Sequence, residues 1–502
     1  MNLLLVAPLL VPLAGGVLAL LVRRPSAERA IGVGSAFALL AVSVALFAVA
    51  LEQGYATSQM GEWPVPYGIT LVLDRLAATM LLVTAVLAVA VTLNSLGGAD
   101  TRGKHFHALV QFQLLGVNGA FLTGDLFNLF VFFEVLLIAS YALLMHGGRP
   151  ERTVATVHVA VLNLLGSTLF LVAVGCIYAA AGSLNLADLA ERAAALPADR
   201  EGLWRAGAWL LVVVFALKAA LLPLGFWLPT AYAAADGTVA ALFAVLTKVG
   251  VVAILRTGTL LFGDVGLEPV VQALALATLA LGAVGMLAAR RLSQLAAYAV
   301  VLSVGTLLVA VSLSTPASVA AAVYYLMQGT VATAGLFLIA ERIGLLRGDS
   351  ADRLVPAAEI RGRLALPLAF LVTAVAIAGL PPFGGFIAKV ALLDAAADAG
   401  AAAWVFPAVL VTTLLAIVAL ARAGSLLFWK SAGRVGRDEP PRAPAGAVAA
   451  ALGIGTLLLA TSPLVFYGGA AMEHAHATAA QLLDPAAYVR AVHAGDPTRE
   501  AP

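Results

Sequence analysis

Long runs of apolar residues, separated by short polar breaks, repeat along the whole 502-residue chain. A transmembrane helix needs about 20 predominantly apolar residues to cross the hydrocarbon core of a bilayer. Fourteen runs are long enough, so the pattern predicts an all-α polytopic membrane protein with about 14 transmembrane helices. The predicted spans are 2–22, 31–51, 76–97, 106–124, 126–146, 154–181, 206–231, 238–262, 269–289, 293–313, 317–340, 364–398, 403–428 and 444–467.

The stretches outside these runs predict smaller features. Residues 52–75 contain two prolines and favour an extended or hairpin loop. Residues 185–201 have the spacing of a short amphipathic surface helix, and the polar segment 468–502 is predicted to be a loosely ordered tail. No basic stretch precedes the run 2–22 and further spans follow it, so we interpret it as a first span and not as a cleaved signal.

Composition agrees with a membrane protein and excludes several other classes. Hydrophobic residues make up 62% of the chain and charged residues 11%, against about 45–50% and 25% in soluble proteins. The net charge of +2 gives no basic patch for nucleic acid. The single Cys176 excludes an internal disulfide or a cysteine-based cluster within the chain, and we expect it to be a small core residue. No phosphate-binding loop, dinucleotide fingerprint or haem ligand set is recognisable, so we expect no cofactor and no metal.

The basic residues predict the orientation of the chain. We let the predicted spans cross the membrane in alternating directions, starting from an N-terminus on the outside. Of the 29 basic residues, 19 then fall in loops on one side of the membrane, six fall on the other side, and four lie inside spans. Short cytoplasmic loops carry the excess of Lys and Arg. We therefore expect a multi-pass protein of the cell membrane with both termini on the extracytoplasmic side and with loops 341–363 and 430–442 inside.

Two similar segments predict an internal repeat. The sequence LKAALLPLGFWLP at 217–229 resembles IAGLPPFGGFIAK at 377–389, and the two segments lie five spans apart. An odd offset gives the two units opposite orientations, and inverted repeats with broken helices at the membrane midplane are typical of transporters. The predicted units are the N-terminal helices 1–105, two inverted five-helix repeats at 106–262 and 269–428, a last span within 429–467 and the tail 468–502.

Prolines within the repeated segments predict helix breaks at Pro223, Pro229, Pro381 and Pro382. A proline inside a helix removes one backbone hydrogen bond and leaves the carbonyl four residues earlier without its partner. Such a carbonyl must be satisfied by protein or water, so each break is a place for a charge, although a kink that serves packing alone is the alternative. The carbonyls expected to be freed belong to Ala219, Gly225, Ile377 and Ala378.

Lysines carry the main candidate chemistry. Only five lysines occur, and Lys218, Lys248 and Lys389 lie inside predicted spans, as does the carboxylate of Glu134. An ionisable group at bilayer depth is costly and usually marks an ion or proton path, and lysine, unlike arginine, can release its proton. We hypothesise that Glu134 and Lys218 form a coupled proton switch. The alternative is a structural ion pair, although three lysines exceed what one carboxylate can neutralise.

Weaker candidates lie nearer the ends of the spans. Asp125 lies at the outer end of the fifth span, where it is either an accessory group for translocation or an exposed acid that needs no functional explanation. His158 is more typical of a core histidine than of a relay member, and Arg256 can extend its side chain outward to the interface. His474 and His476 form an H-x-H pattern, for which metal binding is the less favoured interpretation.

Four segments of the chain resemble a known protein family. They are GDLFNLFVFFEVLLIASYALLMHGG (124–148), FALKAALLPLGFWLPTAY (215–232), LTKVGVVAILRTG (246–258) and AGLPPFGGFIAKVALLDA (378–395). They resemble the antiporter-like membrane subunits shared by Mrp-type cation/proton antiporters and respiratory complex I. The first segment and the chain length are most similar to the D-type branch of that family.

The resemblance implies sodium/proton exchange within a hetero-oligomeric membrane complex, with Na⁺ and H⁺ as the transported ions and other membrane subunits as partners. It assigns proton or ion translocation to Glu134, Lys218, Lys248 and Lys389. The alternative that it leaves open is a proton-pumping membrane subunit of complex I or of a membrane hydrogenase.

The sequence departs from the family in the eleventh span. Members often carry a histidine and a lysine there, whereas this chain has Gln328, Gly329 and Thr333. The loop 233–238 also lacks the prolines usual in the family. Because neither glutamine nor threonine titrates, a relay between Lys248 and Lys389 would need water or hydroxyl groups. The candidate hydroxyls are those of Tyr298, Ser303, Thr330 and Thr333.

Overall fold

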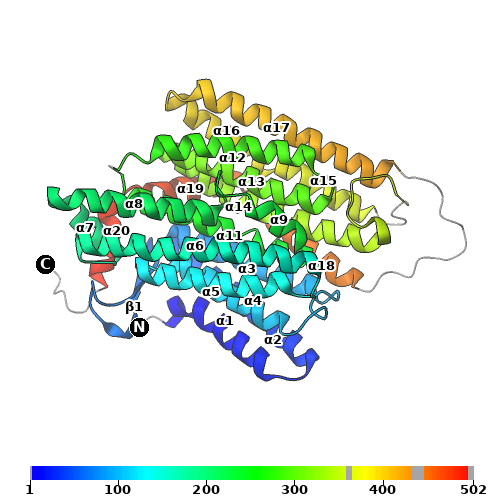
Figure 1. Cartoon of the computed structure of the whole chain (residues 1–502), viewed down its shortest axis with the longest axis horizontal. Coiled ribbons are helices and arrows are strands. Elements are labelled where there is room, and N and C mark those ends of the chain that lie inside the picture. Colours follow the sequence, from blue (N-terminus) through cyan, green and yellow to red (C-terminus); the bar gives the residue numbers. More distant parts are fainter. Residues whose placement is uncertain (1–2, 264, 358–363, 431–445, 496–502) are drawn as a thin grey trace, which may run out of the picture.

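Most of the chain forms long helices that lie side by side in one bundle (Figure 1). The computed structural model describes residues 3–263, 265–357, 364–430 and 446–495. The first helices are α1 (Leu3–Leu21), α2 (Pro25–Gln53), α3 (Arg75–Ser95), α4 (Phe106–Leu122), α5 (Leu126–Met145), α6 (Pro150–Ala181), α7 (Leu186–Ala194), α8 (Ala198–Ala219), α9 (Trp227–Ala234), α10 (Gly237–Phe243) and α11 (Leu246–Leu260). The later ones are α12 (Glu268–Ala288), α13 (Leu292–Ser312), α14 (Pro316–Leu346), α15 (Ala365–Ala378), α16 (Gly384–Asp398), α17 (Ala402–Gly424), α18 (Ala447–Phe466), α19 (Gly468–Leu482) and α20 (Pro485–Ala494). Single 3₁₀ turns lie at Met60–Glu62 and Gly348–Ser350, and a π-turn at Ser425–Trp429.

The predicted membrane class is confirmed. Twelve of the described helical segments are long and apolar enough to cross a membrane, with α10 and α11 counted as one segment, Gly237–Leu260. The shorter apolar helices α4 and α15 lie in the predicted spans 106–124 and 364–398. Each predicted run therefore coincides with a helix or a pair of half-helices.

Three of these segments are broken within the bundle. Helix α8 ends at Ala219 because Ala220 takes a left-handed conformation, with φ at 61°. Gly225 allows the close approach in this turn, since a Cβ there would lie 2.2 Å from the Ala220 carbonyl oxygen. The break between α15 and α16 follows the predicted Pro381-Pro382 position. A break between α10 and α11 at 244–245 was not predicted, because neither Pro nor Gly marks it.

Two of the predicted effects of the prolines are wrong. Pro223 lies in the turn between α8 and α9 and not inside a helix, so it does not remove a helical bond to Ala219. Pro229 lies in the first turn of α9, and the Gly225 carbonyl accepts a bond from the Leu228 N–H at 3.2 Å. An available carbonyl is found at Ala378, as expected, but it is free because α15 ends there and not because of a proline inside a helix; it accepts a bond from the Lys389 ammonium at 2.9 Å.

The predicted hairpin is confirmed, and the predicted loose tail is wrong. Strands β1 (Ala56–Gln59) and β2 (Thr70–Leu73) pair antiparallel. The tail instead folds into α19 and α20, which dock on the bundle. Gln481 holds α19 in place, since its Oε1 accepts a bond from the Arg75 N–H at 2.9 Å and its Nε2 donates to the Gly54 carbonyl at 2.8 Å. The predicted amphipathic helix 185–201 is split into α7 and the start of α8.

The two ends of the bundle carry different loops. At the end that we call the basic end lie the α3–α4, α5–α6, α12–α13 and post-α14 loops, with the ion pairs Arg29–Asp100 and Arg291–Asp352. At the other end, the hairpin end, lie β1 and β2. Both ends of the described chain, the start of α1 and the end of α20, lie near β1 (Figure 1). The predicted inner basic residues Arg361, Arg363, Arg434, Arg437 and Arg442 lie outside the described residues.

Candidate ion-translocation site

Lys218 lies in the last turn of α8, directly before the break, and its side chain is buried. Its ammonium is 3.3 Å from Asn163 Oδ1 and 3.5 Å from Ser167 Oγ, both on α6. The ring of Phe133 lies 6.0 Å away, at the limit of a cation–π contact. The negative end of the α8 dipole favours a cation at this position. A cavity lined by Lys218, Asn163, Tyr141 and apolar side chains adjoins the ammonium.

Glu134 reaches the Lys218 site through one hydroxyl group. It lies half-buried on α5, and Ser167 donates a hydrogen bond to its Oε1. Within the described structure, no direct ion pair joins Glu134 to Lys218, so the expected pair is a bridged one. The Ser167 hydroxyl also lies 2.9 Å from the Asn163 carbonyl oxygen, which gives its one proton two alternative acceptors.

Lys248 is fully buried in the first turn of α11, directly after the break that the sequence did not reveal. Its ammonium is 3.3 Å from Thr247 Oγ1. The partial positive charge at the start of a helix opposes a cation, in contrast to the position of Lys218. Helices α8 and α11 touch at Gly250, where a Cβ would lie 2.6 Å from the Ala219 nitrogen.

Lys389 lies in the second turn of α16 and reaches back across the break. Its ammonium donates to the Ala378 carbonyl at 2.9 Å and to Thr413 Oγ1 at 2.8 Å. The side-chain stem lies against Gly379, where a Cβ would be 2.8 Å from Lys389 Cδ. Like Lys218, this ammonium therefore meets the C-terminal end of a half-helix, which favours its positive charge.

Comparison with known proteins shows the family of the chain. Residues 123–416 match the family described as NADH:quinone oxidoreductase/Mrp antiporter, transmembrane. The chain belongs to this family. It is 41% identical to the D subunit of a probable K(+)/H(+) antiporter of Rhizobium meliloti, over 96% of each chain. It is 33% identical to the D subunit of the Na(+)/H(+) antiporter of Alkalihalophilus pseudofirmus, over 98% of this chain and 99% of the relative.

A solved structure supports the fold as well. A chain in the structure of the Mrp complex from Dietzia sp. superposes with a TM-score of 0.87 at 28% identity, over 98% of this chain and 100% of that one. The resemblance to the D-type subunits of Mrp antiporters is therefore confirmed.

The hydroxyls proposed for a relay within this Mrp-family chain differ in their surroundings. Thr330 donates to the Leu326 carbonyl at 2.6 Å and Thr333 to the Gly329 carbonyl at 2.7 Å, so both hydroxyl protons are bound within α14. Tyr298 is half-buried and packs on α12, where a Cβ at Gly285 would lie 2.1 Å from its ring. Ser303 is buried. The two threonines are therefore poor carriers in this arrangement.

Gln328 lies where the family often has a histidine. It is buried, and neither atom of its amide has a hydrogen-bond partner among the described residues. A Cβ at Gly384, the first residue of α16, would lie 3.2 Å from its Oε1. The amide therefore lies against the start of the half-helix that carries Lys389.

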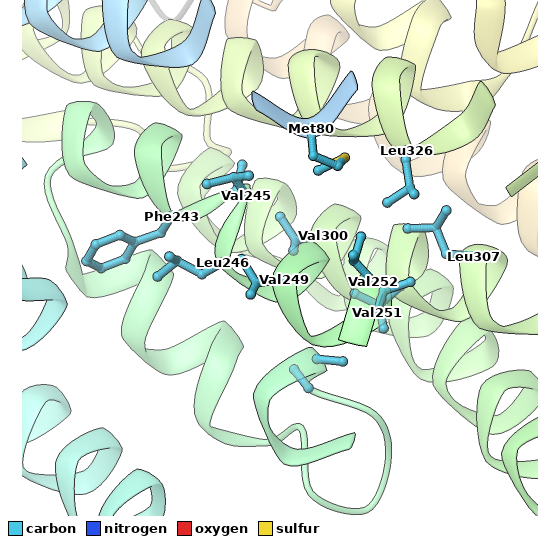
Figure 2. Close-up of a cluster of buried hydrophobic side chains, with 14 of the residues drawn as sticks. Met80, Phe243, Val245, Leu246, Val249, Val251, Val252, Val300, Leu307 and Leu326 are labelled. Atoms are coloured by element: carbon cyan, nitrogen blue, oxygen red, sulfur yellow. The ribbon is translucent and has the colours of Figure 1, made fainter. Parts of the chain in front are cut away.

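Apolar packing surrounds the rest of α11. Figure 2 shows Val249 and Val252 of α11 near Val300 of α13 and Leu326 of α14, with Met80 of α3 beside them. All five side chains are buried. This apolar contact packs α11 against the second half of the molecule.

Several weaker candidates have roles other than those predicted. Asp125 caps the start of α5, since its Oδ1 accepts a bond from the Asn128 N–H at 2.7 Å, and burial raises the pKa of its carboxyl. His158 is exposed on α6 and belongs to neither the core nor the lysine site. The outward extension predicted for Arg256 is wrong, because Arg256 is buried and pairs with Asp74 at 2.7 Å.

The remaining sequence candidates lie apart from the lysines. His474 Nε2 lies 2.8 Å from Thr79 Oγ1, and the His474 ring packs at a tilt against Phe47, with the ring centroids 5.0 Å apart. Among the described residues, no group of three or more His, Cys, Asp or Glu side chains is placed to hold a metal ion. Cys176 is half-buried at the contact between α6 and α8, next to Gly207.

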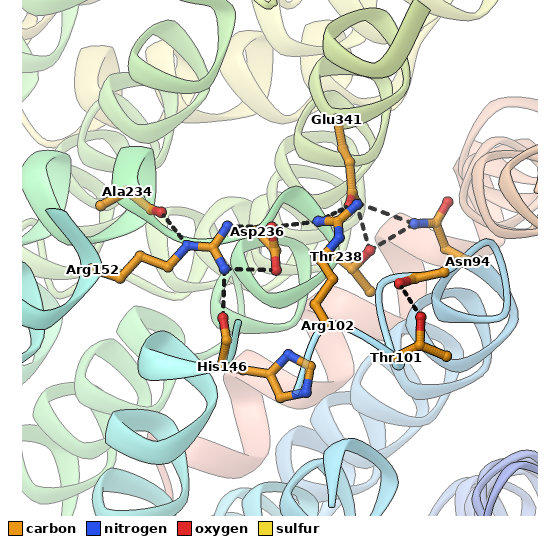
Figure 3. A network of polar contacts seen from close by, with 10 residues as sticks. Asn94, Thr101, Arg102, His146, Arg152, Ala234, Asp236, Thr238 and Glu341 are labelled. Carbon is orange, nitrogen blue, oxygen red and sulfur yellow. Dashed lines mark hydrogen bonds and ion pairs between the residues drawn. The ribbon is translucent and has the colours of Figure 1, made fainter. Parts of the chain in front are cut away.

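Sequence reasoning missed a buried network at the basic end (Figure 3). Arg152 donates to both carboxylate oxygens of Asp236, and Arg102 bridges Asp236 at 2.5 Å and Glu341 at 3.0 Å. Thr238 donates to Glu341 Oε2 at 2.5 Å. One signal in the sequence could have indicated this network. Asp236 and Glu341 lie in or beside loops that the basic residues assign to the same, cytoplasmic side of the predicted topology. Charges at span ends are usually solvated, so the pattern alone did not mark them.

Proposed function

We propose that this chain is the D-type subunit of a multisubunit monovalent cation/proton antiporter and that it moves protons through Glu134, Lys218, Lys248 and Lys389. The observation that carries the proposal is the Lys218 site. There a buried ammonium is held by neutral oxygen atoms and lies one hydroxyl from a carboxylate. Such partners stabilise the charged form less than a contacting carboxylate would, so the lysine can give up its proton.

The Ser167 bridge supports coupling between the two charges. When Glu134 is ionised, the hydroxyl donates to it and leaves an oxygen lone pair facing the Lys218 ammonium. When Glu134 is protonated, the hydroxyl proton can turn to the Asn163 carbonyl instead. The charge on one group thus changes the hydrogen bonding of the other without a permanent ion pair between them.

The packing of the helices supports two inverted repeats. In the first half, α4 packs on α5, α5 on α6 and α6 on α8; in the second half, α12 packs on α13, α13 on α14 and α14 on the half-helices α15 and α16. We infer the repeats 106–262 and 269–428, preceded by the unit 1–105 and followed by 429–467 and 468–502. Fourteen membrane crossings follow if α4 and the pair α15–α16 each cross once.

The surface near Glu134 supports a protein partner. Glu134 is only half-buried on α5. Exposed apolar side chains lie on the same helix, such as Ile138, and on the neighbouring helix α6, such as Leu164. A carboxylate at bilayer depth is costly when it faces lipid. We infer that other membrane subunits of the complex cover this face and that lipid surrounds the remainder.

The transported cation is Na⁺ or K⁺. The relative from A. pseudofirmus is named as part of a Na(+)/H(+) antiporter and that from R. meliloti as part of a probable K(+)/H(+) antiporter. Because these antiporter subunits are 41% and 33% identical to this chain over almost their whole length, we favour the antiporter over a proton pump of the complex I type. The basic end is proposed to face the cytoplasm of a cell membrane.

Vesicles containing the full complex test this function. Addition of Na⁺ or K⁺ to acid-loaded vesicles should release protons, as a pH-sensitive dye reports, and vesicles whose complex lacks this chain should not respond. The proposal fails if the complete, assembled complex shows no cation-dependent proton flux, or if the flux is unchanged without this chain.

A further inference from the structure

The network in Figure 3 contains two carboxylates in unequal surroundings. Asp236 is bound by the forked guanidinium of Arg152 and by Arg102. Glu341 forms an ion pair with Nη1 of Arg102, and the same nitrogen also pairs with Asp236. Its other contacts, from Thr238 and from Asn94 at 3.4 Å, are neutral. Protonation therefore disrupts fewer strong contacts at Glu341 than at Asp236.

A cavity at the basic end reaches Glu341. It is lined by Glu341, Arg102, Asn94 and Arg342, together with apolar side chains of α14 and the start of α18. A cavity with several polar groups can hold water. Asp236 is not part of this lining, so water in the cavity can exchange protons with Glu341 and not directly with Asp236.

Glu341 also touches the half-helix that leads to Lys248. Thr238, the hydroxyl donor to Glu341, lies in the first turn of α10, and α11 follows directly with Lys248. The contact is close, since a Cβ at Gly237 would lie 2.5 Å from Glu341 Cβ. A protonated Glu341 can donate to the Thr238 hydroxyl where the carboxylate accepts from it. Proton binding at Glu341 thus alters the hydrogen bonds at the start of the broken span.

We propose that Glu341 is a further proton-binding residue of the transport path, located at its basic end. While Glu341 is ionised, its ion pair with Arg102, which also binds Asp236 at the N-cap of α10, links α14 to α10. The proton comes from water in the cavity, and its binding releases Arg102 from Glu341 but leaves Arg102 on Asp236. This inference rests on the proposed antiport function. The charged and titratable groups around Glu341 are Arg102, Asp236 and Arg342, with Arg152 and His146 behind Asp236.

The substitution Glu341→Gln in the complete complex tests the proposal. Glutamine keeps the size of the side chain but can neither bind a proton nor pair with Arg102. The cation-driven proton flux per assembled complex should fall by about a hundredfold, the low end for losing a positioned proton-transfer group. Glu341→Asp should retain flux with a shifted pH profile, and Glu151→Gln, an exposed carboxylate at the same end, should behave as the unmodified complex.

Infrared difference spectra of the purified complex give a second measurement that does not depend on transport. Acidification should produce a protonated-carboxyl band that Glu341→Gln removes and Glu151→Gln retains. The proposal is overturned if Glu341→Gln has a normal proton flux and pH profile. It is also overturned if the loss of flux is explained wholly by reduced assembly and the protonated-carboxyl band is unchanged. Since the unmodified complex is measured alongside, absence of any flux there contradicts the antiport function itself and is distinguishable from a failure of Glu341 alone.

Discussion

At the scale of single residues, the three buried lysines and the two arginines Arg152 and Arg256 have different kinds of partner. Lys218, Lys248 and Lys389 contact hydroxyl, amide and carbonyl oxygens. Arg256 and Arg152 instead contact the carboxylates of Asp74 and Asp236. Arginine does not release its proton at working pH, so a carboxylate partner makes it a fixed structural charge. Among these buried cations, the three that can release a proton are the ones with no contacting carboxylate in the described structure.

Asp100 makes the pH dependence of the basic end testable. Burial raises the pKa of this loop carboxyl, but hydrogen bonds from His107 and Arg29 outweigh burial and hold the pKa below its ordinary value. The folded pKa is depressed, so the stabilisation is present above the unfolded pKa of about 3.9 and is lost as the pH falls through the folded value. Asp100→Asn should therefore lower the melting temperature of the complex most above roughly pH 5, with the difference shrinking below about pH 4. A difference that is constant with pH would contradict this assignment.

At the scale of elements, the helix breaks position the lysines, and close glycine contacts fix the half-helices against one another. One such contact joins α8 to α11 at Gly250, beside the backbone of Lys218 and two residues after Lys248. The breaks place the ammonium groups of Lys218 and Lys389 at C-terminal helix ends and Lys248 at an N-terminal end. The three lysines therefore differ in how strongly the helix dipoles favour their charged forms.

Gly250→Leu should separate α8 from α11 and stop transport. A Cβ at this position would lie 2.6 Å from the Ala219 backbone nitrogen, and overpacking of this kind costs about 1–3 kcal/mol. The same helix offers a matched control, because a Cβ at Gly258 meets nothing within 4 Å. Proton flux and melting temperature of the complex should fall for Gly250→Leu and stay unchanged for Gly258→Ala. Normal flux in Gly250→Leu would show that this contact does not position the lysines.

The sequence predicts elements better than it predicts contacts. Run length alone locates the spans, and Pro381-Pro382 marks one break because proline leaves a chemical signature. The break before Lys248 has no such residue. It is stabilised by contacts with other helices, such as the bond that the Tyr232 hydroxyl of α9 donates to the Phe243 carbonyl at 2.8 Å. Arg256 and its partner Asp74 lie 182 positions apart, so a local pattern could not reveal the pair.

At the scale of the whole molecule, the chain separates fixed charge from titratable charge. Ion pairs gather at the two ends of the bundle, and the lysines lie between them at helix breaks. The hairpin end is closed by α20 and the strands around the buried pair Asp74–Arg256, and the basic end by the network around Asp236. Ion pairs therefore lie at both ends of the bundle, on either side of the lysines.

Labelling of introduced cysteines tests the orientation of this arrangement. In a Cys176→Ser background, a cysteine replacing Arg353 at the basic end should react with an impermeant reagent only from the cytoplasmic side. A cysteine replacing Tyr67, an exposed residue between β1 and β2, should react only from outside. The opposite pattern would reverse the orientation that we propose, and labelling of both sites from one side would contradict the span assignment.

The central claim, that Lys218 works by releasing and rebinding a proton, is tested most directly by Lys218→Arg in the assembled complex. Arginine keeps the positive charge and can still bond to Asn163 and Ser167, but it does not release a proton at working pH. The measurement is cation-driven proton flux in vesicles, divided by the amount of assembled complex. Our account predicts that this flux is lost while assembly stays normal. Near-normal flux in Lys218→Arg would mean that the lysine acts only as a fixed charge and would contradict the mechanism.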